Sequence, residues 1–306
     1  MYDLIIIGGG PAGISAGIYA SRKQLKTLFI TKEWGGQSVV SSEIHNWIGT
    51  IAISGADLAK SLENHLKAYA KECVTIMPGV TASHIAKTET GFTVTTSDGA
   101  VHTSTTVLIA AGSSRRKLTV PGAVEFDQKG LTYCATCDGP MFSGMDVAVI
   151  GGGNAGFETA AQLLAYTKSV TLLNSGDTYK ADPITVEKVL AHPNMTGILN
   201  AQTTAILGDG FVNGLTYTNA LGESHTLQVG GIFVEIGMLP NTDFAKDIIA
   251  LDVYNRVTID PWTQRTSVEG IWAAGDCTNV HYHQNNISAG DAVKALEDIY
   301  VYVKTR

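Results

Sequence analysis

Apolar and polar positions near the N-terminus follow the order strand, glycine-rich loop, helix and strand. The run from Asp3 to Ile7 ends in three consecutive isoleucines, which is typical of a parallel strand buried on both faces. A helical pattern follows from Ala12 to about Lys23, and a second strand-like run covers 27–31. The pattern therefore predicts a βαβ unit at the start of the chain.

The same pattern returns 143 residues later, counted from Gly8 to Gly151. Its first strand is expected over 147–150, its helix over 157–166 and its second strand over 170–173. A single repeat at this distance indicates a duplicated domain, because solenoid repeats are only about 20–50 residues long.

A third strand-like run near the C-terminus ends in a turn with an acid. Residues 270–276 read Gly-Ile-Trp-Ala-Ala-Gly-Asp, and a helix is expected over 287–304. We interpret this tail as completing the first domain. The predicted fold class is therefore α/β, with two Rossmann-like dinucleotide-binding domains, the second inserted into the first.

The insertion predicts where the chain passes between the two domains. The split domain should comprise 1–115 and 244–306, and the insert should comprise 116–243. The crossings are expected near 115–117 and near 241–244, the latter just after a proline that we interpret as a turn residue.

Each βαβ unit carries a Gly-x-Gly-x-x-Gly loop between its strand and its helix. Glycines at these positions let the backbone turn tightly and approach the pyrophosphate of a dinucleotide, which lies at the helix N-terminus. The candidate pyrophosphate-binding residues are Gly8, Gly10, Pro11, Ala12 and Gly13 in the first loop, and Gly151, Gly153, Asn154, Ala155 and Gly156 in the second.

The residue that contacts the adenosine ribose is expected roughly 20 positions beyond the first glycine. Counting 23 positions gives Thr31 in the first copy and Asn174 in the second, and neither is the usual acid. Asn174 can still hydrogen-bond a ribose hydroxyl, although without the strength that a charge adds.

Composition and charge exclude several other classes of protein. The chain has 306 residues, of which 44% are hydrophobic and 16% charged, as expected for two globular domains. A net charge of −7 argues against a nucleic acid or an anionic membrane as partner. No apolar run approaches the roughly 18 residues of a membrane span, and we find no signal peptide, so we expect a cytoplasmic protein.

Two of the four cysteines form a Cys-x-x-Cys motif. Such a pair is either a redox dithiol or half of a zinc site, and a zinc site needs two further ligands. Cys73 and Cys277 are isolated in the sequence, and the C-terminal histidines form no standard zinc pattern. We therefore interpret Cys134 and Cys137 as a redox pair and expect no metal.

Asp138 directly follows this dithiol. A thiol takes part in disulfide exchange only as the thiolate, so a neighbouring group that carries its proton is useful. The alternative is that Asp138 is a turn former, since Asp-Gly-Pro is a turn sequence. Its position next to Cys137 favours the catalytic interpretation.

Six short motifs lie along the whole chain. They are Gly-Gly-Gly-Pro-Ala-Gly at 8–13, Gly-Gly-Gln at 35–37, His-Asn-Trp at 45–47, Cys-Ala-Thr-Cys-Asp-Gly at 134–139, Gly-Gly-Gly-Asn-Ala-Gly at 151–156 and Ala-Gly-Asp at 274–276. With these motifs the chain resembles the low-molecular-weight thioredoxin reductases, and especially the flavoprotein reductase part of bacterial alkyl hydroperoxide reductase, its F subunit. The cysteine motif is the most specific of the six.

The resemblance implies FAD in the split domain, a nicotinamide nucleotide in the insert, and a homodimer. The residues that it places in contact with FAD are Gly36, Gln37, Asn46, Asp276 and Gln284, to which we add Gly35 and Gly112. It also implies that Cys137 faces the flavin and that Cys134 attacks the disulfide of a partner protein.

The sequence departs from this family in three places. NADPH-dependent members have His-Arg-Arg and a further arginine where this chain has Asn174-Ser175-Gly176 and Lys180, and no arginine lies between Arg116 and Arg256. Because the planar fork of arginine best holds a 2′-phosphate, we expect NADH to be favoured over NADPH. The family's Arg-Gln-Ala reads His283-Gln284-Asn285 here. The flavoproteins of alkyl hydroperoxide reductase also have a thioredoxin-like N-terminal extension, whereas this sequence starts at the first loop.

The predicted activity is that of an FAD-dependent pyridine-nucleotide:protein-disulfide oxidoreductase. Electrons would pass from NAD(P)H through FAD and the Cys134–Cys137 disulfide to a separate thioredoxin- or glutaredoxin-like protein, because the chain has one dithiol motif. We expect the insert to rotate between two arrangements, one that serves the nicotinamide and one that serves the dithiol.

Other functions are compatible with the same motifs. An H2O2-forming NADH oxidase would turn over without a disulfide partner, since reduced flavin reacts with oxygen. A flavin-bound redox sensor would show no steady turnover with any donor. Some relatives use ferredoxin or a deazaflavin as donor and have eroded nicotinamide loops, but the loop at 151–156 is intact.

Overall fold

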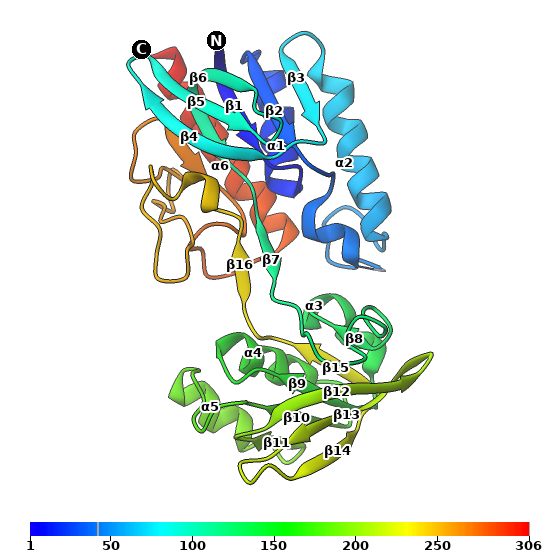
Figure 1. The fold of residues 1–306 in the computed structure, drawn as a ribbon. Coiled ribbons are helices and arrows are strands. Elements are labelled where there is room, and N and C mark those ends of the chain that lie inside the picture. Colours follow the sequence, from blue (N-terminus) through cyan, green and yellow to red (C-terminus); the bar gives the residue numbers. More distant parts are fainter. Residues whose placement is uncertain (42, 306) are drawn as a thin grey trace. The chain divides into compact units, whose positions relative to one another are not determined.

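The computed structural model describes residues 1–41 and 43–305, which divide into two compact units (Figure 1). The first, here called the split unit, comprises Met1–Ser114 and the stretch from Leu239 onward. The second, the inserted unit, comprises Arg115–Met238. Each unit combines helices with a largely parallel sheet, and the predicted α/β fold class is confirmed.

The sheet of the split unit has the strand order β3-β2-β1-β6-β5-β4, and β17 also pairs with β6. Strands β1, β2, β3 and β17 run parallel to the second half of β6, whereas β4 and β5 form an antiparallel hairpin beside its first half. The strands are β1 (Tyr2–Ile7), β2 (Thr27–Thr31), β3 (Val74–Pro78), β4 (Ala82–Thr88), β5 (Gly91–Thr96), β6 (Val101–Ile109) and β17 (Ile271–Ala273).

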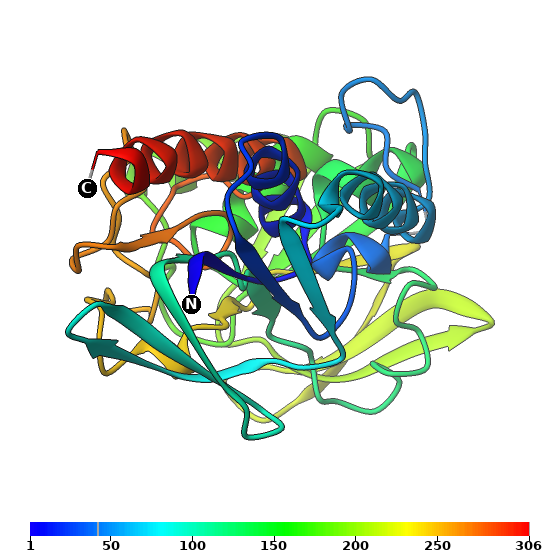
Figure 2. The same cartoon turned by 90° about the horizontal axis from the view of Figure 1, so that it is seen from above.

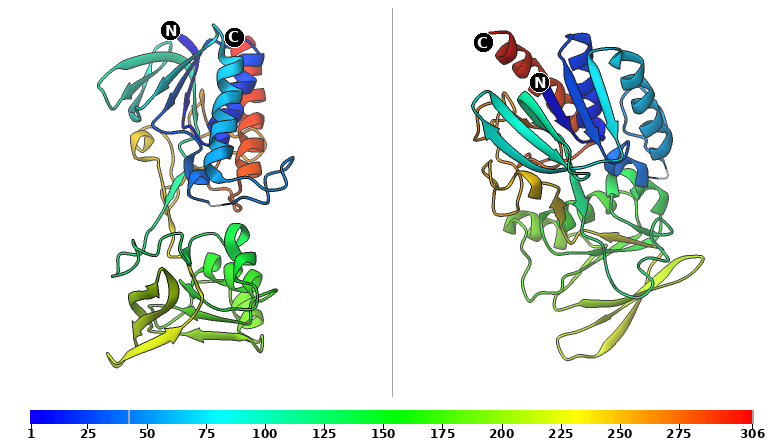
Figure 3. Two further views of the ribbon diagram at one scale, coloured as in Figure 1. Left: turned by 90° about the vertical axis from the view of Figure 1, so that its right-hand side faces the viewer. Right: turned by 45° about the horizontal axis from the view of Figure 1, so that its top comes forward.

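Strand β1 is apolar throughout its second half because both faces of the sheet are covered. Leu4 and Ile6 pack with residues of the helices, whereas Ile5 and Ile7 pack with residues of β4, β5 and the segment that follows β16. Figure 2 shows the helices side by side, and the left view of Figure 3 shows them on one side of the sheet. They are α1 (Pro11–Arg22), α2 (Gly55–Ala70) and α6 (Asn285–Lys304), and the short turns are η1 (Gly36–Val40) and η3 (Asp243–Ala245).

The longest helix among the described residues is α6, with 20 residues. It buries Ala292, Ala295, Leu296 and Ile299 and carries charged side chains between them. None of the helices in the described part of the chain combines the length and apolarity needed to cross a bilayer.

The inserted unit repeats this arrangement. Its parallel sheet has the order β11-β10-β9-β15-β8, and strands β12, β13 and β14 form a separate antiparallel sheet. Helices pack on one face of the parallel sheet and the antiparallel sheet packs on the other. The elements are β8 (Leu131–Thr132), α3 (Ala135–Asp138), η2 (Gly139–Phe142), β9 (Asp146–Ile150), α4 (Asn154–Leu163), β10 (Ser169–Leu173), α5 (Pro183–Leu190), β11 (Met195–Ile198), β12 (Gln202–Asp209), β13 (Phe211–Thr218), β14 (Ser224–Gln228) and β15 (Gly231–Val234).

Both chain crossings run through one two-stranded ribbon, formed by β7 (Ser113–Arg115) and β16 (Met238–Pro240). The return crossing therefore comes before residue 239, earlier than the 243 expected from the sequence. Pro240 is part of β16 rather than a turn, and the side-chain and backbone N–H groups of Asn241 bond to Ala111 and Gly112 of the split unit. These bonds place Asn241 with the split unit.

Candidate active site

The first glycine loop is fixed by close backbone packing at its two ends. Gly8 has φ +126°, and a Cβ there would lie 2.1 Å from the carbonyl oxygen of Ala110. A Cβ on Gly13 would lie 1.8 Å from the carbonyl oxygen of Gly8. Both positions therefore require glycine for the loop and α1 to pack on the sheet.

The middle glycine of this loop is different because its Cβ direction is open. The nearest atom that a Cβ on Gly10 would meet is the Cα of Gly36, at 3.9 Å. Gly10 begins α1 as its N-cap, with Pro11 at the first helical position. This is the arrangement that lets a pyrophosphate approach the backbone at a helix N-terminus.

The open side of the loop belongs to a cavity of about 960 Å³ in the split unit, a size suited to a large cofactor. Eight of the predicted FAD-binding residues line this cavity. They are Gly8, Gly10, Pro11, Ala12, Gly36, Gln37, Gly112 and Asp276. The remaining predicted FAD residues, Gly13, Gly35, Asn46 and Gln284, lie outside the lining.

Hydrogen bonds between side chains order the segments that surround this cavity. The Ser288 hydroxyl on α6 donates to Asp276 Oδ1 at 3.0 Å. Asn46 Nδ2 donates to Gln284 Oε1 at 3.1 Å, so two of the residues that the family resemblance places in contact with FAD are paired with each other. Asn46 and Gln284 therefore order the segments next to the cavity.

Sequence reasoning missed several residues of this cavity. They include Lys32 and Glu33 after β2, residues 81–84 at the start of β4, and Phe244, Lys246 and Asp247. The count from the first glycine stopped at Thr31, whose hydroxyl donates to the carbonyl oxygen of Glu33 at 2.5 Å. Glu33, two positions beyond Thr31 and just after β2, is the acid that could have marked this part of the cavity in the sequence.

The second glycine loop has the same geometry as the first. Gly151 also has φ +126°, and a Cβ there would lie 2.2 Å from the carbonyl oxygen of Glu235. A Cβ on Gly156 would lie 1.9 Å from the oxygen of Gly151, whereas Gly153 has no atom within 4 Å in that direction. The loop leads into α4, which begins at Asn154, and is therefore shaped to admit a second pyrophosphate.

The side chain of Asn174, the residue expected to contact the ribose, lies against this loop. A Cβ on Gly152 would meet its side chain at 2.6 Å. Its amide nitrogen donates to the carbonyl oxygens of Gly176 and Thr178, at 3.0 and 2.8 Å. The amide nitrogen is thus engaged in holding its own loop, which leaves Oδ1 as the atom that can accept from a ribose hydroxyl.

A carboxyl group that the sequence analysis missed lies at the end of β15. Thr159 Oγ1 on α4 donates to Glu235 Oε1 at 3.0 Å. Burial raises the pKa of Glu235 to about 7, with the positive charge of Arg115 and the Thr159 hydrogen bond opposing that effect. No sequence motif marks this residue, because an acid after an apolar strand has no fixed meaning by itself.

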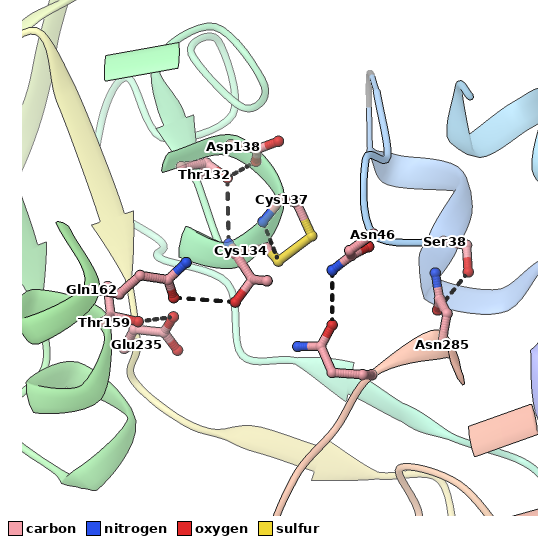
Figure 4. Close-up of a disulfide and its surroundings, with 12 residues drawn as sticks. Ser38, Asn46, Thr132, Cys134, Cys137, Asp138, Thr159, Gln162, Glu235 and Asn285 are labelled. Carbon is pink, nitrogen blue, oxygen red and sulfur yellow. Dashed lines mark hydrogen bonds between the residues drawn. A yellow bond between two sulfur atoms is a disulfide. The ribbon is translucent and has the colours of Figure 1, made fainter. Parts of the chain in front are cut away.

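The two cysteines of the motif form a disulfide in the inserted unit (Figure 4). Cys134 caps the N-terminus of the short helix α3, and its sulfur accepts the backbone N–H of Cys137 at 3.2 Å. Both cysteines are partly exposed. Cys73 and Cys277 are free, and burial raises the pKa of the Cys277 thiol to about 12, which keeps it protonated and unreactive.

Asp138 is the last residue of α3 and is buried, only 7% exposed. The hydroxyl of Thr132 donates to its Oδ2 (Figure 4). Burial raises the pKa of Asp138, and the Thr132 hydrogen bond and the Arg115 charge only partly oppose this shift. A buried carboxyl next to a disulfide is suited to holding a proton and passing it to a sulfur.

Comparisons with known proteins agree with this geometry. A family model described as "Pyridine nucleotide-disulphide oxidoreductase" matches residues 2–293. The chain is similar to a thioredoxin reductase from Giardia duodenalis (30% identity, TM-score 0.93, 99% of both chains covered) and to one from Streptococcus pyogenes MGAS5005 (32% identity, TM-score 0.90, 100% of this chain and 99% of the other).

Curated relatives are longer than this chain. A protein named "NADH dehydrogenase" from Bacillus subtilis (strain 168) and the F subunit of alkyl hydroperoxide reductase from Staphylococcus aureus (strain MRSA252) are each 39% identical over 303 residues. The match covers 99% of this chain but 58% and 59% of those relatives.

Proposed function

Because the chain belongs to the pyridine nucleotide-disulphide oxidoreductase family, we propose that it transfers electrons from a nicotinamide nucleotide, through a flavin, to the Cys134–Cys137 disulfide and on to a disulfide of a separate protein. The observation that carries this proposal is the disulfide itself, which shares one unit with a complete dinucleotide loop and lies next to the buried Asp138. The first glycine loop and its cavity, in the split unit, provide for the flavin.

FAD fits the split unit. The open Cβ direction of Gly10 leaves room for a pyrophosphate at the start of α1, and Asp276 and Gln37 line the same cavity. When bound there, FAD supplies the two-electron transfer between a nicotinamide and a disulfide. The residues of this chain bind and orient it and shield it from water.

The inserted unit supplies the acid and the sulfur atoms. Reduction breaks the bond between Cys134 and Cys137 and adds two electrons, so one sulfur leaves as a thiolate that needs a proton. Asp138 can supply that proton because its raised pKa keeps it protonated to a higher pH than an ordinary aspartate. By the family resemblance, Cys137 is the flavin-side sulfur and Cys134 attacks the partner's disulfide, after which Asp138 takes a proton back.

The donor is proposed to be NADH rather than NADPH. Lys180 is the single cation between 174 and 180, and its backbone N–H is bonded to the carbonyl oxygen of Gly152 at 2.8 Å. This segment contains no arginine fork for a 2′-phosphate. Asn174 Oδ1 can accept from the ribose hydroxyl that NADH has at that position.

The acceptor is proposed to be a thioredoxin- or glutaredoxin-like protein, since the similar solved proteins are described as thioredoxin reductases. The proposal includes a cytoplasmic homodimer, and an inserted unit that rotates to serve the nicotinamide and the dithiol in turn. A second candidate is an NADH oxidase that forms H2O2, since reduced flavin reacts with oxygen. The name of the B. subtilis relative, "NADH dehydrogenase", mentions NADH and no disulfide acceptor.

Stopped-flow reduction and steady-state turnover test this function. Anaerobic NADH should bleach the flavin absorbance, and turnover should require an added thioredoxin-like disulfide. The variants C134S and C137S should each lose acceptor reduction while flavin reduction continues. An oxidase is indicated if oxygen alone supports full NADH turnover in both variants, and acceptor reduction that survives in either variant contradicts the proposed route.

A further inference from the structure

We infer that Glu235 contacts the nicotinamide half of the bound dinucleotide and couples nucleotide binding to the release of a proton. The inference rests on the proposed nicotinamide site of the inserted unit. It adds a positioning residue that lies outside both glycine loops and outside the dithiol.

The internal duplication identifies the place that Glu235 occupies. In the split unit, the first glycine of the loop packs on the carbonyl oxygen of Ala110, and in the inserted unit it packs on that of Glu235. The Ala110 N–H donates to Ile7 at 2.8 Å, and the Glu235 N–H donates to Ile150 at 2.8 Å. Glu235 is therefore the structural counterpart of Ala110.

Ala110 lines the cavity of the split unit, so its counterpart is expected to lie against the ligand of the inserted unit. The neighbouring helix position differs in the same way. Eight residues after the first glycine, α1 has Ala16 and α4 has Thr159, whose hydroxyl bonds to Glu235. Two methyl groups in one copy are thus replaced by a carboxyl and a hydroxyl in the other.

The sheet order indicates which half of the nucleotide is near Glu235. Asn174 follows β10 and Glu235 follows β15, and these strands flank β9 on opposite sides. A dinucleotide lies across the carboxyl ends of such strands at the point where the strand order reverses. With the adenosine ribose at Asn174, the nicotinamide nucleoside is on the side of Glu235.

The charges around Glu235 leave it able to change its protonation state near neutral pH. Burial raises its pKa to about 7, and the carboxylate of Glu158 on α4 adds to this, while Arg115 on β7 and the Thr159 hydroxyl oppose it. Thr159 occupies Oε1. The other oxygen can accept a hydrogen bond from a ribose hydroxyl or from the carboxamide of the nicotinamide, and such donors favour the ionised form.

The test uses the oxidised FAD-loaded enzyme and tetrahydro-NAD, an NADH analogue that cannot transfer hydride. Its Kd should fall by up to about tenfold between pH 6 and pH 8, because the ionised form of a group with pKa about 7 accepts the bond more strongly than the protonated form. Calorimetry at pH 7 in buffers of different ionisation enthalpy should detect the release of up to about half a proton per site on binding, because a group with pKa about 7 is half ionised there. E235Q should abolish both effects, whereas E158Q, which removes the neighbouring exposed carboxyl, should keep them.

ADP-ribose, which has the second ribose but no nicotinamide, serves as the comparison ligand. If it also releases a proton, the contact is to the ribose, and if it does not, the contact is to the carboxamide. Three results would overturn the inference: a pH-independent Kd for the unaltered enzyme, proton uptake instead of release, or the same proton release in E235Q. Complete failure of tetrahydro-NAD to bind would instead count against the proposed nicotinamide site, so the two failures are distinguishable.

Discussion

Thr136, between the two cysteines, donates a hydrogen bond of 3.1 Å to Oε1 of Gln162 on α4. The same helix begins at Asn154, in the second glycine loop. One helix therefore connects the proposed nicotinamide site to the dithiol through direct contacts at both of its ends.

A double-mutant cycle should measure this contact. The variants T136V and Q162A should each lower the free energy of unfolding by about 0.5–1 kcal/mol, as expected for a neutral and largely exposed hydrogen bond. The double variant should lose less than the sum, because the first change already breaks the bond. Urea denaturation gives all three values, and strict additivity would show that the bond does not form in solution.

Asp138 should control the pH dependence of disulfide reduction. D138N should slow reduction of the acceptor by at least about 100-fold, a common effect for loss of a general acid. In the unaltered enzyme the acid is protonated below its raised pKa, so the rate should decline as pH rises through that value. T132V removes the hydrogen bond that lowers the pKa of Asp138, so the decline in rate should move to higher pH. If the pH profile of T132V does not move, a group other than Asp138 controls the decline.

Glu235 should make the fold less stable at high pH. Its pKa is about 7 in the folded chain and roughly 4.3 when unfolded, so the stability present below about pH 4.3 is lost as pH rises to about 7. Relative to the unaltered protein, E235Q should gain about 1–3 kcal/mol of unfolding free energy between pH 5 and pH 8. Guanidinium titrations at pH 5 and pH 8 give the unfolding free energies of both proteins. The same difference between E235Q and the unaltered protein at the two pH values would contradict this prediction.

Two alanine substitutions in the first loop should separate folding from FAD binding. A Cβ on Gly13 would lie 1.8 Å from a backbone oxygen, whereas one on Gly10 would make only an ordinary van der Waals contact, with the Cα of Gly36 at 3.9 Å. G13A should lower the Tm of the apoprotein, at a cost of about 1–3 kcal/mol. G10A should leave that Tm unchanged but weaken FAD binding at least tenfold, about 1.4 kcal/mol. Equal FAD affinity in G10A and the unaltered protein would show that the pyrophosphate does not bind against Gly10.

NADH should be preferred over NADPH by about 1–3 kcal/mol in kcat/KM, the scale of a hydrogen bond to a charged group. Because Asn174 brings no charge to repel a phosphate, the preference should be moderate. The double variant S175R/G176R introduces two arginines after β10, where the NADPH-dependent members of the family have them, and should reduce the preference for NADH. Steady-state kinetics with both nucleotides decide, and a higher kcat/KM for NADPH in the unaltered enzyme would reverse the assignment.

Sequence patterns were sufficient where packing leaves little choice. The strand expected at 27–31 is β2, because its five residues are all buried, and the resemblance to thioredoxin reductases is confirmed by the comparisons. The helix expected from 157 begins instead at Asn154, since the end of the glycine loop already has helical geometry. The helix expected from 287 likewise begins at Asn285.

Other features depend on contacts between distant segments. The burial of Asp138 depends on β8 and on the hydroxyl of Thr132, which no local pattern reveals. The position of Glu235 against Gly151 follows from strand pairing between β15 and β9. The turn assigned to Pro240 was wrong because a proline at the edge of a two-stranded ribbon is compatible with a strand.

The paired crossings have a consequence for how the protein can be altered. The two ends of the inserted unit are neighbours, since the Arg116 N–H donates to the carbonyl oxygen of Gly237 at 3.0 Å. On the other side of the ribbon, the Asn241 N–H donates to Gly112 at 3.0 Å. A short peptide could therefore close the split unit if the intervening residues were removed. The inserted unit could thus be exchanged for one of different specificity without cutting any strand of the large sheet of the split unit.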